Sequence, residues 1–242
     1  DYGNKAMVAT GFPQDLTEDF DMSAAVNPQK PTSGRGMTSL VSFLGRANYN
    51  LMNKYLFTAS FRRDGSSKFA PGNKWSNFAS GAIAWRASEE QFIKDLNVFS
   101  NLKFRASYGQ TGNQAIGAYA TRDYLTVANY PINGALASGF ANLTWRGPAN
   151  PDLKWETTSQ YNVGVDMGFF QNRINLTIDL YYKKTSDLLQ NIQIPQSTGF
   201  SNMTTNFGNV TNKGLEITGK FYAITGKNLN WDFDANISFN RN

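Results

Sequence analysis

The stretch Tyr161–Tyr182, YNVGVDMGFFQNRINLTIDLYY, decides the expected fold. Apolar and polar residues alternate along it on both sides of a break at Gln171 and Asn172. Two alternating runs joined by a short connection are typical of a β-hairpin. With this break at the tip, Phe169 pairs with Ile174, and each cross-strand pair is apolar with apolar or polar with polar. A slip of one residue would destroy that match, so the sequence predicts the register as well as the hairpin.

The apolar face of this hairpin is taller than a globular strand requires. It covers about nine residues on each strand, which is about 20 Å at roughly 3.3 Å per residue and a tilt of about 40°. Globular strands usually have about five or six residues. A tall row with aromatic ends is typical of a membrane-spanning strand, so we expect these side chains to face lipid. The predicted lipid-facing residues are Tyr161, Val163, Val165, Met167, Phe169, Ile174, Leu176, Ile178, Leu180 and Tyr182.

Composition excludes several classes of protein. No run of the sequence approaches the roughly 18 apolar residues of a transmembrane helix, whereas the mean hydropathy of -0.44 suits strands that cross a membrane by alternation. The chain has no cysteine and no histidine. It therefore lacks disulfides, thiolate ligands and the commonest general base, and we expect no enzyme, no cofactor and no metal. The net charge of +5 is scattered along the chain, which argues against a nucleic-acid partner.

Two groups of carboxylates are candidates for a calcium site and for a catalytic acid–base pair. The spacing of Asp15, Glu18, Asp19 and Asp21 matches no calcium loop, so we interpret them as a solvated acidic loop. Asp232 and Asp234 could be the acid and base of a glycosidase. Because they lie two residues apart on one row of a predicted strand, with Trp231 and Phe233 on its other face, we interpret them as lining a wet interior.

Alternation predicts further strands on both sides of the central hairpin, over residues 38–50, 55–62, 75–86, 102–108, 213–222 and 231–239. Ser88, followed by two glutamates and by Phe92, Ile93 and Leu96, predicts a capped short helix over residues 88–96. The segments 1–37, 112–154 and 186–212 lack sustained periodicity and are predicted to be loops.

The predicted connections are unequal at the two edges of this sheet. One edge receives Leu51–Lys54, Ala87–Asn101, Phe170–Arg173 and Ala223–Leu229, and the other receives the long connections and Asp64–Lys74. Short periplasmic turns and long outer loops characterise bacterial outer-membrane barrels. The sequence thus predicts an all-β, antiparallel, up-and-down transmembrane β-barrel segment of about eight strands. Both ends of the chain look like cuts through a larger protein. We expect residues 1–37 to be part of an extracellular loop and residues 38–242 to be a partial barrel without a plug domain.

Five blocks of the chain resemble the SusC/RagA-like branch of the TonB-dependent outer-membrane transporters of Bacteroidetes. They are Tyr55–Phe69, Ala84–Phe92, Leu102–Asn113, Asn150–Thr158 and Phe207–Ile217, and they occur in the order found in that family. The resemblance implies a barrel of about 22 strands with a plugged lumen. It also implies import of glycans or peptides together with a SusD-like lipoprotein, powered through the TonB complex in the outer membrane.

Aromatic residues of the long loops are the candidate substrate contacts. Stacking on sugar rings and ordinary loop or lid packing both remain open for them; they are Tyr119, Tyr124, Tyr130, Phe140 and Trp145. An alternative of another class is a soluble or secreted β-sandwich that binds carbohydrate, in which the apolar rows face a second sheet. A complete small eight-stranded barrel is disfavoured by the length of the loops.

Overall fold

The computed structural model describes residues 2–10, 25–28, 31–123, 125–133, 135–142, 147–227 and 229–242. The chain divides into two compact units, Asp1–Ser39 and Leu40–Asn242. In the first unit, β1 (Tyr2–Ala6) pairs with β4 (Thr32–Gly36), and the short β2 (Ala9–Thr10) pairs with β3 (Asn27–Pro28). These short strands were not predicted within the loop expected over residues 1–37, because backbone pairing there does not depend on an apolar pattern.

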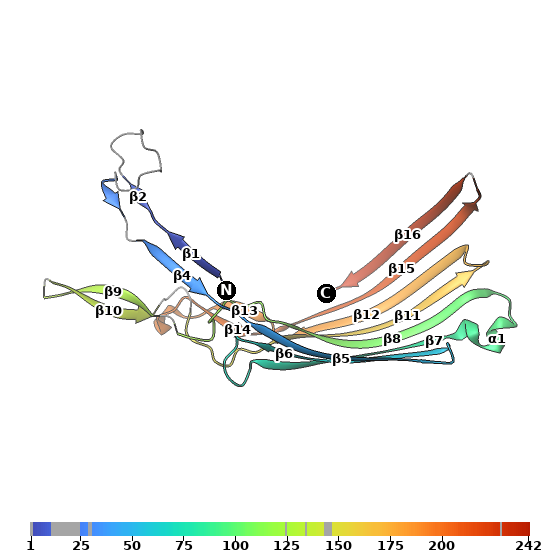
Figure 1. Cartoon of the computed structure of the whole chain (residues 1–242), viewed down its shortest axis with the longest axis horizontal. Helices are drawn as coiled ribbons and strands as arrows, with labels where there is room; N and C mark the ends of the chain where they lie inside the picture. Colours follow the sequence, from blue (N-terminus) through green and yellow to red (C-terminus); the bar gives the residue numbers. More distant parts are fainter. Residues whose placement is uncertain are drawn as a thin grey trace. The chain divides into compact units, whose positions relative to one another are not determined.

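The second unit is built on an eight-stranded antiparallel sheet in the order β16-β15-β12-β11-β8-β7-β6-β5. Its long strands follow one another along the chain as an up-and-down meander (Figure 1). They are β5 (Leu40–Leu51), β6 (Tyr55–Ser66), β7 (Trp75–Arg86), β8 (Phe99–Asn113), β11 (Glu156–Phe169), β12 (Ile174–Ser186), β15 (Asn209–Thr225) and β16 (Asn230–Arg241). The predicted fold class and the eight strands are confirmed.

The central hairpin has the predicted register. Phe169 pairs with Ile174, Val165 with Ile178 and Tyr161 with Tyr182. The connection spans residues 170–173, where Phe170, Gln171 and Asn172 have φ of 52°, 57° and 63°. Such left-handed backbone is uncommon outside glycine and asparagine, so the apolar match between the strands, rather than an ideal turn sequence, sets this register.

Two of the predicted loops contain hairpins of their own. β9 (Leu125–Ile132) pairs with β10 (Ala135–Asn142) within residues 112–154, and β13 (Leu189–Gln193) pairs with β14 (Asn202–Asn206) within residues 186–212. The 3-10 turn η3 (Gln196–Thr198) lies in the second of these loops. These strands were missed because their residues do not alternate between apolar and polar over a full strand length.

The connections are distributed as predicted. Residues 52–54, 87–98, 170–173 and 226–229 join strands at one end of the sheet, where Figure 1 shows α1, and the long connections join strands at the other end. Where a helix was predicted over residues 88–96, the structure has the 3-10 turn η2 (Ala87–Glu89) and the short helix α1 (Gln91–Lys94). The predicted cap is wrong, since neither N-terminus has a side-chain cap and the two glutamates instead pair with lysines. Among the described residues, no helix has the length and apolar character needed to cross a membrane.

Candidate functional site

One face of the eight-stranded sheet carries apolar rows that run across all eight strands. Because the registers join directly, each row can be followed from strand to strand. One row consists of Tyr49, Phe57, Ile83, Ala106, Val163, Leu180, Leu215 and Phe239. The next consists of Leu51, Tyr55, Trp85, Phe104, Val165, Ile178, Ile217 and Ile237. We call this surface the apolar face.

The residues predicted to face lipid all lie on the apolar face. Tyr161, Val163, Leu180 and Tyr182 are exposed, and the other six are half-buried by their neighbours in the rows. Aromatic side chains gather at both ends of the hairpin. The ring centroids of Tyr108 and Tyr161 are 4.8 Å apart near the long loops, and those of Phe99 and Phe169 are 5.2 Å apart near the short turns.

Among the described residues of the second unit, no protein layer lies over the apolar face. The other sheets described there are two-stranded, and Val163, Leu180 and Ile237 remain exposed. A β-sandwich needs a second sheet packed about 10 Å away over the apolar rows of the first sheet. The second packed sheet that a carbohydrate-binding sandwich requires is therefore not found over these rows among the described residues. The rows stay exposed, as a membrane-facing surface requires.

The opposite face of the sheet is polar and carries an ion-pair network. Arg105 on β8 donates through Nε to Asp166 Oδ2 and through Nη2 to Asp166 Oδ1, both at 2.9 Å. Its Nη2 also donates to Asp179 Oδ2 on β12 at 3.2 Å. Lys103 Nζ lies 3.9 Å from Asp166 Oδ2, and the Thr177 hydroxyl donates to Asp166 at 3.3 Å. Two cations and two anions are thereby neutralised across three strands.

Gly164 makes this network possible. It stands between Arg105 and Asp179 in the register, on the strand that separates them. A Cβ at this position would collide with Asp179 Oδ1 and lie 2.9 Å from Arg105 Nη2. Its lack of a side chain lets the guanidinium reach over β11.

A second charged group lies on the polar face nearer the sheet edge. Lys220 Nζ on β15 is 3.3 Å from Asp232 and 3.4 Å from Asp234 on β16. The two carboxylates thus share one lysine across neighbouring strands. The interpretation of Asp232 and Asp234 as polar lining agrees with this placement.

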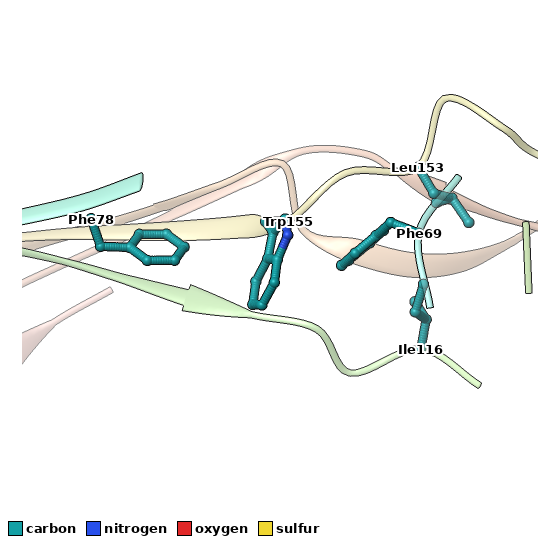
Figure 2. Close-up of a cluster of buried hydrophobic side chains, with 5 residues drawn as sticks. All are labelled: Phe69, Phe78, Ile116, Leu153 and Trp155. Atoms are coloured by element: carbon teal, nitrogen blue, oxygen red, sulfur yellow. The ribbon is translucent and has the colours of Figure 1, made fainter. Parts of the chain in front are cut away.

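A compact apolar core lies among the long connections of the second unit (Figure 2). We call it the loop-end cluster; it comprises Phe69, Phe78, Ile116, Leu153 and Trp155. The Trp155 ring is 5.4 Å from Phe69 and 5.8 Å from Phe78 between centroids, and its Nε1 donates to the Lys74 carbonyl at 3.0 Å. Sequence reasoning missed this cluster, although Phe69 and Trp155 belong to two of the blocks that carry the family resemblance.

Three of the five aromatic residues predicted to contact substrate lie within the described residues. Tyr119 lies in a turn after β8, where the guanidinium of Arg122 is 5.8 Å from its ring centroid. Tyr130 is a backbone partner of Ala137 in the β9–β10 hairpin, and Phe140 is a partner of Val127. Tyr124 and Trp145 lie outside the described residues. Their role as substrate contacts stays a prediction.

Within the described ranges, no group of three or more carboxylate or other ligand side chains could hold a metal ion. Asp15, Glu18, Asp19 and Asp21 lie outside those ranges.

Comparison with protein families gives one match. A model described as "TonB dependent receptor-like, beta-barrel" matches residues 2–242. Among curated proteins, the TonB-dependent receptor SusC of Bacteroides thetaiotaomicron is 41% identical over 210 residues, which are 84% of this chain and 20% of that protein. The TonB-dependent receptor P39 of Formosa agariphila is 39% identical over 236 residues, 97% of this chain and 22% of that protein.

Comparison with solved structures gives a consistent result. A chain of the RagAB peptide importer in its closed-closed state superimposes with a TM-score of 0.83 and 29% identity, covering 99% of this chain and 26% of that one. The open-open state of the same importer gives a TM-score of 0.81 and 31% identity, covering 96% of this chain and 25% of that one. The chain spans about a fifth of the length of the curated relatives it matches.

Proposed function

The chain belongs to the TonB-dependent receptor-like β-barrel family, and from this premise we propose that it is part of a transporter that imports glycans or oligopeptides together with a SusD-like surface lipoprotein. It is a barrel segment of SusC/RagA type and an outer-membrane protein. The family is one of receptors and transporters and not of enzymes. The observation that carries the proposal is the eight-stranded sheet with one continuous apolar face and one ion-paired polar face.

We orient the sheet by its connections. The short connections, residues 52–54, 87–98, 170–173 and 226–229, face the periplasm, and the long connections face outward, as in other outer-membrane barrels. The apolar face meets outer-membrane lipid and the polar face lines the transport lumen. Residues 1–37 belong to the extracellular side in this arrangement, and residues 38–242 form the partial barrel.

The two edge strands support a larger barrel. Along β5 and β16, every residue is exposed. An open edge presents unpaired backbone donors and acceptors, which a membrane-spanning sheet must satisfy with further strands. We propose that other strands of the full transporter pair with both edges, and that parts outside this chain contact the TonB complex.

The polar face suits an uncharged, hydrogen-bonding solute. Towards the long loops it presents hydroxyl and amide groups, among them Ser107, Gln160 and Asn162, which are linked by hydrogen bonds of 2.8 and 3.3 Å. Both glycans and peptide backbones offer matching donors and acceptors. The RagAB importer, to a chain of which this chain is similar, is described as a peptide importer.

The test is uptake by cells that carry or lack the full-length transporter. Deletion of its gene is expected to abolish uptake of one class from panels of labelled glycans and oligopeptides, and a plasmid copy is expected to restore it. A protonophore should block the restored uptake because import is powered through TonB. Co-purification of a surface lipoprotein with the tagged transporter tests the partner. Unchanged uptake of every glycan and peptide after deletion would contradict the proposal.

A further inference from the structure

Glu90, in the connection between β7 and β8, is held by three donors from other parts of the chain. Its Oε2 lies 2.7 Å from Lys54 Nζ, and its Oε1 accepts from the Tyr55 hydroxyl at 2.9 Å and from the Trp85 indole Nε1 at 3.4 Å. The side chain of Glu90 is only 16% exposed. A carboxylate with three fixed donors holds the start of α1 in a single position.

The contacts of Glu90 join the start of α1 to the apolar face of the sheet. Tyr55 and Trp85 are neighbours in the second apolar row, next to Phe104 and Val165. The rings of Trp85 and Phe104 are stacked 5.7 Å apart. Glu90 therefore joins the connection to the short-turn end of the apolar face and not to the polar face.

The segment beyond Glu90 has one polar and one apolar side. Gln91 donates to Asp95 at 2.8 Å, and Lys94 pairs with Glu89 at 3.0 Å. Ile93 is half-buried, whereas Phe92 and Leu96, one helical turn apart, are 60% and 56% exposed. Large apolar side chains on a connection that met only water would expose this surface at a cost of about 25 cal/mol per Å².

The other short connections repeat this feature. Met52, Phe170 and Leu229 are each exposed, and each lies on a different one of them. Each connection at the short-turn end thus carries at least one exposed large apolar residue.

We propose that residues 87–98 form an interfacial element that lies in the periplasmic leaflet of the outer membrane, with Phe92 and Leu96 inserted at the boundary between lipid headgroups and acyl chains. Glu90 is its positioning residue. Short amphipathic segments bury their apolar side about 5–10 Å into this boundary and keep polar groups among the headgroups. The occupant of the exposed apolar side is phospholipid, because Glu90 ties the start of the segment to Tyr55 and Trp85 of the apolar face. The inference rests on the proposed membrane orientation.

The test places a polarity-sensitive fluorophore on single cysteines in the full-length transporter reconstituted into phospholipid vesicles. The labelled variants are Phe92→Cys and Leu96→Cys, and Gln91→Cys is the matched control on the polar side of the same segment. Nitroxide lipids labelled near the headgroup are expected to quench the first two several-fold more than the control. Quenching of all three by aqueous iodide, with no difference between them, would overturn the inference. Protection of the fluorophores from iodide that appears only after a periplasmic protein is added would overturn the inference as well.

Two further variants separate the possible failures. Val165→Cys reports the orientation of the sheet: lack of quenching there by deep nitroxide lipids would contradict the proposed function itself. Quenching at Val165 without quenching at Phe92 would contradict only the interfacial element. Glu90→Gln combined with Phe92→Cys is expected to reduce lipid quenching while the barrel keeps its resistance to unfolding in detergent. Undiminished quenching in that variant would show that Glu90 does not position the segment.

Discussion

The loop-end cluster and the apolar face use their apolar side chains in opposite ways. In the loop-end cluster, Leu153 has no exposed surface and Phe69 has 1%. On the apolar face, Val163 is 58% exposed and Leu180 is 54% exposed. Both regions belong to the same unit and are joined by the same strands.

This difference shows where the chain supplies its own apolar environment. The long connections fold back on one another and make a dry core, whose burial stabilises them by about 1.5–3 kcal/mol for each large side chain. The sheet relies on its backbone ladder and leaves its apolar face exposed, and we propose that lipid covers it. Changes in the loop-end cluster should therefore have the same effect in detergent and in lipid, whereas changes on the apolar face should depend on the surrounding medium.

The largest expected effect comes from the loop-end cluster. Trp155→Ala removes contacts with Phe69 and Phe78 and the hydrogen bond to Lys74, and it should lower the free energy of unfolding by about 3–5 kcal/mol. Denaturant titration of the full transporter in detergent and in vesicles measures it. Phe207→Ala, at an exposed aromatic residue of the second long connection, is the control and should change little. Equal losses for both variants would remove the distinction between the regions.

The next effect tests the two faces of the central hairpin. Val165→Arg places a charge on the apolar face near the middle of the membrane and should cost about 2–4 kcal/mol in a folding titration into lipid vesicles. Thr177 lies on the polar face beside Asp166, so Thr177→Arg should be much milder. Equal tolerance at both positions would refute the assignment of the apolar face to lipid.

A third variant links the sheet to the loop-end cluster. A Cβ at Gly112 on β8 would overlap the ring of Phe78, so Gly112→Ala must displace a buried ring and should cost about 1–3 kcal/mol. Gly219→Ala on β15 is the matched control, because nothing lies within 4 Å of the added Cβ. Thermal melting of the two variants compares them directly, and a loss confined to Gly219→Ala would show that the packing around Phe78 differs.

The smallest expected effect concerns pH and the short-turn end. Hydrogen bonds from Lys54 and Tyr55 hold the pKa of Glu90 below its ordinary value of 4.5, and the bond to Glu90 raises the pKa of Lys54 above 10.5. The stability that ionised Glu90 contributes to the fold is therefore complete above the pKa of Glu90 in the unfolded chain. It is lost as the pH falls through the lower pKa that Glu90 has in the folded protein. The Lys54 contribution is lost only as the pH rises through its raised folded value.

Melting temperatures against pH for the unmodified protein and for Glu90→Gln check this sign. The melting temperature of the unmodified protein should exceed that of Glu90→Gln at neutral pH, and this difference should shrink below about pH 4.5. Asp152→Asn, at an exposed carboxylate in a turn before β11, is the control. A difference that grows as the medium becomes more acidic would contradict the assignment.

Sequence reasoning succeeded where the pattern was long and local. The pairing of Tyr161 with Tyr182 and the unequal connections followed from alternation and its breaks. The β9–β10 and β13–β14 hairpins and the pairing of β1 with β4 were missed, because they are held by backbone hydrogen bonds without an alternating apolar pattern. At the candidate site, the paired carboxylates Asp232 and Asp234 were interpreted as lining, whereas the grouping of Phe69, Leu153 and Trp155 was not anticipated.

The sequence alone determined the eight long strands, the register of the central hairpin and the two faces of the sheet, since alternation with a period of two residues fixes which side each residue takes. Only the tertiary structure decided which distant residues meet. Arg105 reaches Asp179, 74 residues away, across Gly164, and Trp155 bonds to the carbonyl of Lys74, 81 residues away. Glu90 joins the second apolar row through Tyr55, 35 residues earlier. These contacts depend on how neighbouring strands are placed side by side, which no local pattern of residues encodes.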